Sequence, residues 1–303
     1  MEDAAAKEFT HGQPVELDGE SVVVVTGAAG GMGRAIADAF ADQGRALLLC
    51  DLAPLTEAQA SITASRPPLP LITTVTGDIS DPGFGDKIVS ALNGRKVSVL
   101  AHAAGVSPSF QNGRRIFDIN FTAGKHLVEK IEPHMEATSA IILVASLSGA
   151  FISNFAIDVA AKRHIRGHWS PTVWLMKQWA YTSYAISKRC VQLYVQTTAT
   201  RLAEKGVRIL SVSPGVIDTA MMTAYGEQPA LATFVGSSGL KRMGRAEEVA
   251  SVVSFLASPG ASYCTGTDIL VDGGLTAQKG RAIWTTLRAL MKSRPAAANG
   301  EGR

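Results

Sequence analysis

A glycine-rich stretch near the start of the chain, residues 21–34, is the sequence feature that most constrains the fold. It begins with four apolar β-branched residues, Val22–Val25, whose unbroken apolar character is typical of a strand buried on both faces of a parallel sheet. Three glycines follow with the spacing G-x-x-x-G-x-G, namely Gly27, Gly31 and Gly33. Glycines let the backbone turn tightly and approach a pyrophosphate, which the N-terminus of a following helix also favours. The stretch therefore predicts a strand, a phosphate-binding turn and a helix.

A second apolar run, Ala46–Cys50, ends at Asp51. In a dinucleotide-binding fold, a carboxylate at this position accepts hydrogen bonds from the adenosine ribose hydroxyls. The glycine turn and Asp51 together therefore predict a dinucleotide site. For the glycine turn alone, an ordinary connection between a strand and a helix is the alternative.

The composition argues against several classes of protein. The chain has 303 residues, of which 46% are hydrophobic, and its formal net charge is only +3. Because no basic stripe is concentrated in the body of the chain, we expect no nucleic-acid partner. No apolar run has the length of a membrane span, and residues 1–20 lack the pattern of a signal peptide, so we expect no integral membrane segment and a cytoplasmic location. The three cysteines, Cys50, Cys190 and Cys264, are interpreted as core residues and not as disulfide or metal ligands.

Short apolar runs alternate with amphipathic stretches along the chain. Seven runs predict strands: Val22–Thr26, Ala46–Cys50, Leu71–Val75, Val97–Ala101, Ala140–Ala145, Arg208–Val212 and Asp268–Val271. Five stretches predict helices: Met32–Gln43, Gly85–Leu92, Gly124–Glu136, Ser183–Glu204 and Ala246–Ala257. Such alternation gives parallel pairing with right-handed crossovers. The predicted fold class is therefore α/β, with one doubly wound (Rossmann) domain over residues 18–278 and helices on both faces of a seven-stranded parallel sheet.

Four segments depart from this alternation. Residues 1–17 are predicted to be an N-terminal extension. Residues 149–180 are a helical insertion, too long for a simple connection, and contain the amphipathic segment Phe155–His168. Residues 217–240 are predicted to be an apolar substrate loop. Residues 279–303 hold a basic amphipathic segment and a tail; packing against its own or a second subunit is the simpler interpretation, and a membrane surface or another partner is the alternative.

A second motif, Tyr184-Ala-Ile-Ser-Lys188, falls on a predicted helix. Side chains four residues apart project from one face, so the Lys188 ammonium can approach Tyr184 and favour its phenolate. Free tyrosine has a pKa of about 10 and is a poor base at neutral pH, whereas a nearby lysine and a positive nicotinamide would lower that pKa. Taken alone, the pair also fits an ordinary helix surface.

These motifs, in their order along residues 21–275, resemble those of the short-chain dehydrogenase/reductase family. Thr26-Gly-Ala-Ala-Gly-Gly-Met-Gly33 resembles the family's TGxxxGxG turn, and Gly77-Asp78-Ile79 resembles the acidic pair that holds adenine. His102-Ala-Ala-Gly105 is similar to the N-[NA]-A-G stretch, and Ser213-Pro-Gly-Val-Ile-Asp-Thr219 is similar to the segment that binds the nicotinamide. The residues that resemble the catalytic tetrad are Asn120, Ser146, Tyr184 and Lys188.

The resemblance implies hydride transfer between a nicotinamide and a secondary alcohol or ketone. Tyr184 would be the general acid/base, Ser146 would bind the substrate oxygen, and Lys188 would hold the nicotinamide ribose and lower the pKa of Tyr184. Asn120 would fix a water molecule that links Lys188 to solvent. The implied cofactor contacts are Gly27, Gly31, Met32, Gly33, Asp51, Leu52, Asp78, Ile79, Ala103, Gly105, Tyr184, Lys188, Pro214, Ile217 and Thr219.

The cofactor is predicted to be NAD. Asp51 would accept the two ribose hydroxyls and would repel a 2′-phosphate. No Arg or Lys follows Asp51 directly or stands in the glycine turn before Gly33 to neutralise such a phosphate. The nearest cations, Arg34 and Arg45, are expected to face solvent or the sheet edge.

Two departures from the family pattern matter. His102 stands where the family usually has Asn, and we expect a structural and not a catalytic role for it. Tyr184 follows Ser146 by 38 residues, which is more than is usual in the family. This insertion and the short connection between Gly105 and Asn120 resemble the 3α-hydroxysteroid dehydrogenase/carbonyl reductase group. Because an inserted helix would cover a common oligomer interface of the family, we expect a homo-oligomer that is a dimer and not the usual tetramer.

The sequence thus predicts an NAD-dependent oxidoreductase, without a metal, for a bulky apolar alcohol or ketone such as a hydroxysteroid or a terpenoid. The alternative among enzymes is a diol or sugar-alcohol dehydrogenase, which would place more polar residues in 217–240 than the chain has. The alternative outside enzymes is a regulator that binds NAD(H) without turnover. All four tetrad residue types are present, and this argues against a regulator.

Overall fold

The chain folds around one parallel sheet of seven strands, in the order β3-β2-β1-β4-β5-β6-β9. The computed structural model describes residues 21–64, 71–220 and 229–277. The strands are β1 (Ser21–Thr26), β2 (Ala46–Asp51), β3 (Ile72–Thr76), β4 (Lys96–His102), β5 (Met135–Val144), β6 (Arg208–Pro214) and β9 (Asp268–Val271). The predicted doubly wound seven-stranded fold is confirmed. The predicted segments 1–17 and 279–303 lie outside the described residues.

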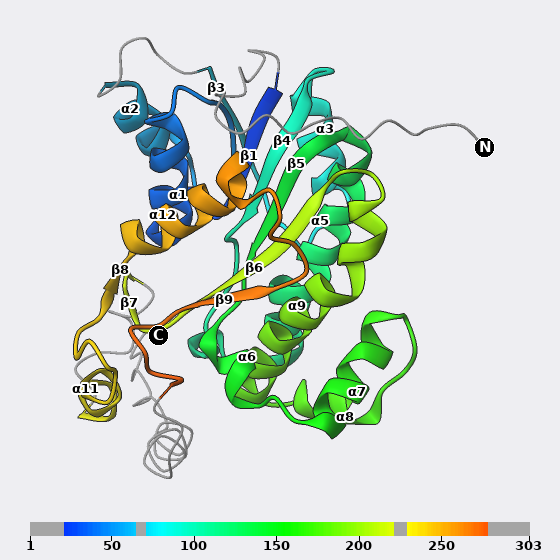
Figure 1. The fold of residues 1–303 in the computed structure, drawn as a ribbon, viewed down its shortest axis with the longest axis vertical. Helices are drawn as coiled ribbons and strands as arrows, with labels where there is room; N and C mark the ends of the chain where they lie inside the picture. The colour runs from blue at the N-terminus through cyan, green and yellow to red at the C-terminus, as the bar shows by residue number, and fades with distance from the viewer. Residues whose placement is uncertain (1–20, 65–70, 221–228, 278–303) are drawn as a thin grey trace, which may run out of the picture.

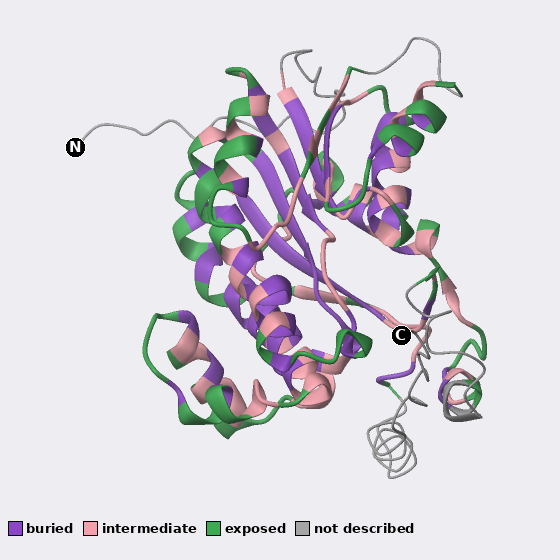
Figure 2. Cartoon of the chain, turned by 180° about the vertical axis from the view of Figure 1, so that it is seen from behind, coloured by how far each residue is buried: buried purple, intermediate pink, exposed green. Residues whose placement is uncertain are grey.

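Helices cover both faces of this sheet (Figure 1). One face carries α1 (Gly31–Ala41), α2 (Thr56–Ala64) and α12 (Ala246–Ala257), and the other carries α3 (Phe84–Leu92), α4 (Gly113–Phe117), α5 (Ala123–Ile131) and α9 (Ala180–Ala203). Neighbouring residues of β1 alternate between the two faces, since Val22 and Val24 belong to one buried cluster and Val23 and Val25 to the other. The central strands such as β1 and β2 are therefore buried on both sides, as Figure 2 shows in purple, which explains their unbroken apolar sequences.

The sheet order reverses between β1 and β4, which lie side by side at its centre. The chain leaves β1 towards β2 and β3 on one side, and returns to continue from β4 on the other. In doubly wound folds, ligands bind at the carboxyl ends of the strands beside this reversal. The topology therefore places a binding site between the residues that follow β1 and those that follow β4.

Several elements, α4 among them, differ from the helices and loops predicted from the sequence. The predicted helix Gly124–Glu136 is shorter, because Pro133 lies in a 3-10 turn after α5 and β5 already begins at Met135. The helix α2 was not predicted, since its apolar periodicity is weak. The predicted substrate loop 217–240 is not entirely loop: it contains β7 (Ile217–Asp218), which pairs with β8 (Gly244–Arg245), and the helix α11 (Pro229–Gly236). Residues 221–228 of that loop lie outside the described residues.

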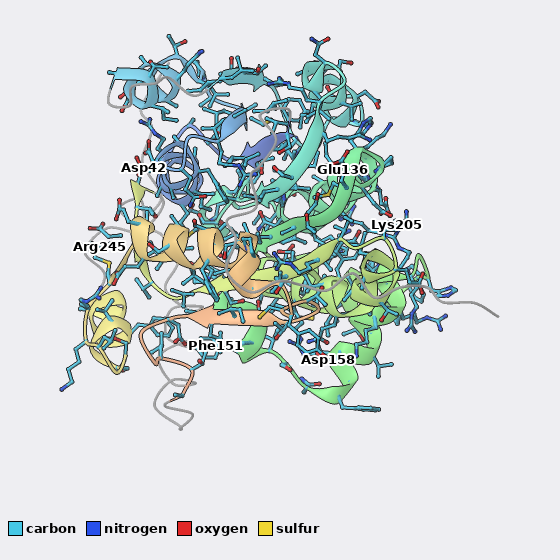
Figure 3. The ribbon with its side chains drawn as sticks, turned by 45° about the horizontal axis from the view of Figure 1, so that its top comes forward. Asp42, Glu136, Phe151, Asp158, Lys205 and Arg245 are labelled. Carbon is cyan, nitrogen blue, oxygen red and sulfur yellow. The ribbon has the colours of Figure 1, made fainter. Side chains whose placement is uncertain are left out.

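The insertion 149–180 folds into short helices against α9. It includes the end of α6 (Leu147–Phe151), then α7 (Phe155–Ile165) and α8 (Pro171–Met176). The helices α7 and α8 protrude together from the rest of the chain in Figure 1. Figure 3 labels Phe151 at the end of α6 and Asp158 in α7. Arg189 of α9 holds Asp158 of α7 through two hydrogen bonds of 2.8 and 2.6 Å. Ala161, Ile165 and Val173 are buried against the same side of the sheet as α9. None of the helices in the described residues is long and apolar enough to span a membrane.

Candidate active site

A cleft of about 540 Å³ opens at the carboxyl ends of β1, β2, β3 and β4. Its wall includes the glycine turn after β1, Asp51 at the end of β2, the segment 77–79 after β3, and the segment 103–106 after β4. These segments are far apart in sequence and meet because parallel strands end at the same edge of a sheet. The cleft therefore lies where the sheet order reverses, as the topology requires.

The glycine turn has the tight geometry that a pyrophosphate site needs. Gly27 and Gly31 have positive φ angles of 72° and 55°, which other residues adopt rarely. A Cβ atom on Gly33 would lie 2.0 Å from the backbone oxygen of Gly27, so only glycine fits there. The helix α1 begins at Gly31 without a side chain that caps it, so its first N–H groups are open to an anion in the cleft. The turn therefore fits the phosphates of a dinucleotide.

Two backbone hydrogen bonds fix the carboxylate of Asp51 beside the glycine turn. Its Oδ2 accepts a hydrogen bond from the backbone N–H of Ala29, and its Oδ1 from that of Ala53, both at 2.9 Å. The two bonds fix the carboxylate between the glycine turn and the end of β2, and each oxygen keeps a lone pair for a further donor. A ribose hydroxyl that lies along the turn would donate a hydrogen bond to one of these carboxylate oxygens.

The cleft brings together eleven of the predicted cofactor contacts: Gly27, Gly31, Met32, Gly33, Asp51, Leu52, Asp78, Ile79, Ala103, Gly105 and Thr219. Tyr184 and Lys188 lie on α9 beyond its inner end. Pro214 is buried at the end of β6, and the roles predicted for these three residues stay predictions.

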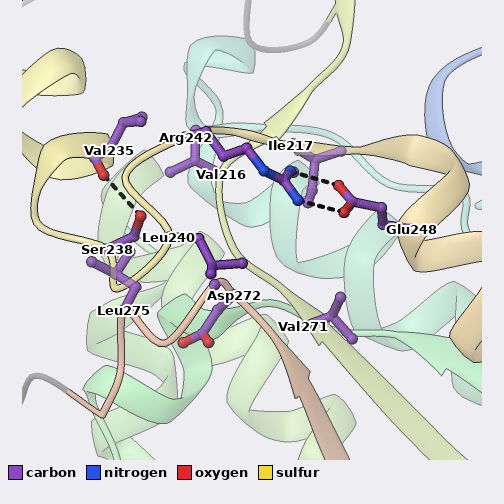
Figure 4. Close-up of a pocket in the computed structure, with 12 residues that line it drawn as sticks. Val216, Ile217, Val235, Ser238, Leu240, Arg242, Glu248, Val271, Asp272 and Leu275 are labelled. Atoms are coloured by element: carbon purple, nitrogen blue, oxygen red, sulfur yellow. Dashed lines mark hydrogen bonds and ion pairs between the residues drawn. The ribbon is translucent and has the colours of Figure 1, made fainter.

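The fourth predicted contact outside the cleft, Ile217, lines a separate pocket of about 90 Å³ beside α11 (Figure 4). In that pocket Arg242 and Glu248 form two hydrogen bonds of 2.8 and 2.7 Å, and apolar side chains such as Val235 and Leu240 also line it. This pocket is separate from the dinucleotide cleft, and the cofactor role of Ile217 stays a prediction.

The four tetrad residues converge beyond Gly105, at the inner end of the cleft. Ser146 caps α6 directly after β5, and its hydroxyl makes a hydrogen bond with Tyr184. The Lys188 ammonium lies 5.9 Å from the centre of the Tyr184 ring. A Cβ atom on Gly105 would lie 3.0 Å from Oδ1 of Asn120 and 3.6 Å from Nζ of Lys188, so the missing side chain leaves the cleft open to both.

In the protein alone, the environment of Tyr184 raises its pKa. Burial raises the pKa of Tyr184 above its usual value, and the hydrogen bond with Ser146 only partly opposes this. Lys188 donates a hydrogen bond of 2.9 Å to the backbone oxygen of Val144, and burial lowers the pKa of Lys188 to about 8. In the protein alone desolvation of the phenolate therefore dominates, and the lowering of the Tyr184 pKa expected from Lys188 together with a positive nicotinamide stays a prediction.

Asn120 lies in a single π-helical turn, residues Asp118–Thr122, between α4 and α5. Its side chain accepts a hydrogen bond from the N–H of Val106 at 2.8 Å and donates one to the backbone oxygen of Val106 at 2.9 Å. The amide thus fixes the segment that follows β4 against the helix. π-Helical turns inside helices occur frequently at functional sites.

His102 is buried at the end of β4, and its contacts favour the structural role expected for it. Its Nδ1 shares a hydrogen bond of 2.8 Å with the hydroxyl of Thr26, which in turn accepts the N–H of Ala104. Its Nε2 points at Gly124, where a Cβ atom would lie only 2.7 Å away. Burial, with a smaller effect of Lys188, lowers the pKa of His102 to about 3, so the ring is neutral at physiological pH.

Arg115 is a residue of the cleft that the sequence did not single out. Its guanidinium lies 2.6 Å from the carboxylate of Asp78. Arg34 and Arg45, the two cations considered from the sequence, instead bond to Asp38 and Ser98 and do not line the cleft. Arg115 belongs to the connection between Gly105 and Asn120, and nothing in its local sequence marks it as a ligand.

Leu147, the residue after Ser146, belongs to a small apolar cluster. Leu147 and Phe234 of α11 are buried together with Leu275. The rings of Phe151 and Phe234 meet edge to face, with centres 6.2 Å apart. Among the described residues there is no cluster of His, Cys, Asp and Glu that could hold a metal ion.

Family models match two parts of the chain. Residues 21–167 match the model described as short chain dehydrogenase, and residues 173–276 match the model described as Enoyl-(Acyl carrier protein) reductase. A structure titled 3-oxoacyl-[acyl-carrier protein] reductase from Brucella melitensis in complex with NAD has the same fold, with a TM-score of 0.71 at 22% identity over 86% of this chain and 99% of that one.

Two curated relatives match the chain along nearly their whole length. A cis-4-hydroxycyclohexanecarboxylate dehydrogenase of Sinomonas cyclohexanicum is 30% identical, over 86% of this chain and 99% of that protein. A meso-2,3-butanediol dehydrogenase of Serratia marcescens is 30% identical over 86% and 96% of the two chains. A solved Brucella melitensis protein titled short-chain dehydrogenase/reductase, glucose/ribitol dehydrogenase, is 28% identical, with a TM-score of 0.67 over 84% of this chain and 96% of that one.

Proposed function

Because the chain belongs to the short-chain dehydrogenase/reductase family, we propose that it is an NAD-dependent oxidoreductase for a secondary alcohol or its ketone. The observation that carries this proposal is the convergence of Ser146, Tyr184 and Lys188 at the inner end of a cleft that fits a dinucleotide. When bound, the nicotinamide accepts hydride from the carbinol carbon or returns it to the carbonyl carbon.

The residues of the chain would bind the substrate oxygen and move its proton. During oxidation, the hydroxyl of Ser146 holds the substrate oxygen and Oη of Tyr184 takes its proton; during reduction, Tyr184 gives that proton back. Lys188 binds the nicotinamide ribose and stabilises the Tyr184 phenolate. Asn120 keeps the segment after β4 in place beside both residues and fixes a water molecule that relays the proton to solvent.

For the substrate we propose a cyclic, predominantly apolar secondary alcohol, of hydroxysteroid or terpenoid type. The apolar cluster that begins at Leu147, directly after Ser146, and includes Phe151 and Phe234 supports this class. The relative that acts on 4-hydroxycyclohexanecarboxylate also supports a ring that carries a secondary alcohol. A diol or sugar alcohol is the second candidate, favoured by the butanediol dehydrogenase of Serratia marcescens and the galactitol 2-dehydrogenase of Cereibacter sphaeroides, each 30% identical.

The test is NADH formation by the purified protein with NAD and a panel of alcohols. We expect kcat/KM for steroid, terpenoid or cyclohexanol-type alcohols to exceed that for 2,3-butanediol and galactitol by at least tenfold. The opposite order would assign the second candidate. Binding of NADH without turnover of any alcohol or ketone would assign the regulator considered from the sequence.

Asp51 is expected to make the protein prefer NAD over NADP. Its carboxylate is fixed where a 2′-phosphate would lie, and like charges repel. We expect Asp51→Asn to reduce the ratio of kcat/KM for NAD to that for NADP by at least tenfold. Asp86→Asn, which removes an exposed carboxylate of α3 outside the cleft, should leave the ratio unchanged. A wild-type protein that uses both cofactors equally would contradict the proposal.

We also propose a cytoplasmic homodimer. The helix α7 packs on α9, the long helix that carries Tyr184 and Lys188, so the insertion occupies a face that is expected to build the usual tetramer. The molar mass in solution, measured by light scattering, tests the dimer, and a tetramer would contradict it.

A further inference from the structure

Three polar side chains of α9 stand four residues apart and therefore share one face of the helix: Tyr184, Lys188 and Gln192. Gln192 is 1% exposed, and its amide reaches the same end of β5 as Lys188 does. Lys188 donates to the backbone oxygen of Val144, and Nε2 of Gln192 donates to the backbone oxygen of Ser146 at 3.2 Å. The buried amide of Gln192 thus holds the backbone of the residue whose hydroxyl would bind the substrate oxygen.

A glycine in α6 makes this contact possible. The helix α6 runs so close to α9 that a Cβ atom on Gly149 would lie 2.8 Å from the backbone nitrogen of Arg189 and 2.9 Å from Oε1 of Gln192. The N–H of Gly149 also donates to the backbone oxygen of Ser146, at 3.0 Å. That oxygen therefore has one donor from its own helix and one from α9, and both depend on the close approach of the two helices.

The same amide reaches the ends of two more strands. Nε2 of Gln192 lies 2.9 Å from the hydroxyl oxygen of Ser213 in β6 and 3.2 Å from Oδ2 of Asp268 in β9. The hydroxyls of Ser211 and Ser213 donate to Oδ1 of Asp268, at 2.6 and 2.8 Å. Ser213 is the first residue of the segment that resembles the nicotinamide-binding segment of the family. Gln192 therefore connects the end of β5 with the start of that segment.

The insertion holds the other end of the Gln192 amide. Oε1 of Gln192 accepts from Nη1 of Arg189 at 3.0 Å, and the same guanidinium donates to both carboxylate oxygens of Asp158 in α7. The side chains of Arg189 and Asp158 are only 12% and 23% exposed. Because a guanidinium only donates and a carboxylate only accepts, Arg189 and Asp268 fix the orientation of the amide between them. A continuous series of hydrogen bonds therefore leads from the insertion to Ser146.

We propose that Gln192 is a positioning residue of the dehydrogenase reaction, which holds the backbone of Ser146 in place, and that the insertion 149–180 sets the position of Gln192 through Asp158 and Arg189. This inference rests on the proposed function, because it concerns the same reaction. None of these three positioning residues belongs to a motif of the family resemblance. The inference gives the insertion a role in the geometry of the active site, in addition to its packing on α9.

Gln192→Met tests the amide. The substitution keeps the length and the flexibility of the side chain and removes its donors and its acceptor. The backbone of Ser146 is then free to shift relative to Tyr184, and a misplacement of about 1 Å can cost about 10²-fold in rate. We expect kcat for alcohol oxidation to fall by about 10- to 100-fold. KM for the alcohol and the Kd for NADH should stay within about threefold of wild type, because the loss concerns the transition state.

A second variant tests the link to the insertion. Arg189→Met combined with Asp158→Leu removes the ion pair without leaving a buried charge unpaired. We expect kcat to fall by about threefold or more, and the addition of Gln192→Met should lower kcat no further than Gln192→Met alone, because the pair acts through Gln192. The matched control is Arg201→Met combined with Glu132→Leu, which removes another ion pair of α9. Its kcat should stay within about twofold of wild type.

Thermal unfolding of each variant is measured as well, and the kinetics are recorded below all melting temperatures. If Gln192→Met is too unstable to purify, Gln192→Glu takes its place: it has the same shape, keeps the acceptor for Arg189 and loses the amide donors. It is expected to lower kcat by about tenfold or more.

The outcomes separate this inference from the proposed function. A merely structural role of Gln192 would lower the melting temperature and leave kcat of the folded protein unchanged, which would overturn this inference alone. Losses of kcat that multiply when the Asp158 and Arg189 substitutions are combined with Gln192→Met would remove the insertion from it. A wild-type protein that binds NADH and oxidises no alcohol would overturn the proposed function, and this inference with it.

Discussion

Replacement of Tyr184 by Phe is expected to reduce kcat/KM by about 10²- to 10⁴-fold, the range over which a general acid/base contributes to catalysis. The substitution removes one oxygen atom, the one that would exchange a proton with the substrate, and keeps the ring that packs between Ser146 and Lys188. The Kd for NADH should change by less than about twofold, since the cleft residues that hold the dinucleotide remain. Steady-state kinetics and NADH fluorescence titration measure the two quantities separately.

Two controls make the Tyr184 result specific. Tyr194→Phe removes a phenol further along α9, beside Thr198, and should leave turnover within about twofold of wild type. The pH profile is the second control. Burial raises the pKa of Tyr184, so the phenolate that accepts the proton becomes more abundant as the pH rises, and the wild-type rate of alcohol oxidation should increase from neutral to alkaline pH. Normal turnover in Tyr184→Phe would exclude Tyr184 as the acid/base.

Replacement of Gly33 by Ala is expected to abolish tight NADH binding and to destabilise the fold by about 3 kcal/mol. The new Cβ would lie 2.0 Å from the backbone oxygen of Gly27 and 3.1 Å from that of Thr26, and neither atom can swing away as a flexible side chain could. The glycine turn or the start of α1 must then shift, which moves the N–H groups that would face the pyrophosphate. Fluorescence titration with NADH and thermal unfolding measure the two effects.

Gly30→Ala is the matched control for this destabilisation. A Cβ on Gly30 meets no atom within 4 Å, and Gly30 has φ −164°, an extended conformation open to any residue. Its melting temperature should stay close to that of wild type, whereas that of Gly33→Ala falls by several degrees. Equal melting temperatures for Gly33→Ala and wild type would contradict the packing seen at this turn.

The strands could be predicted from the sequence because local patterns specify them, whereas the tetrad came from a family resemblance and its catalytic role stays a prediction. Val22–Val25 and the other apolar runs are long enough to be strands and too short to be buried helices, and α12 was predicted with its observed bounds, Ala246–Ala257. The predictions failed where a tertiary contact overrides a weak local pattern. The helix predicted to end at Glu136 stops at Ile131, since the chain must enter β5 beside β4, and α11 occupies part of a segment that has the composition of a loop.

The amino-acid sequence by itself determined which chemical groups the protein carries and the α/β alternation that brings them to one edge of a sheet. Only the tertiary structure decided which groups face one another there. It paired Arg115 with Asp78 across the cleft, placed Ile217 in another pocket, and buried Tyr184 so that its pKa rises despite Lys188 nearby. The physical reason is that hydrogen-bond partners and desolvation depend on distances between segments far apart in sequence, whereas strand and turn preferences depend on neighbouring residues.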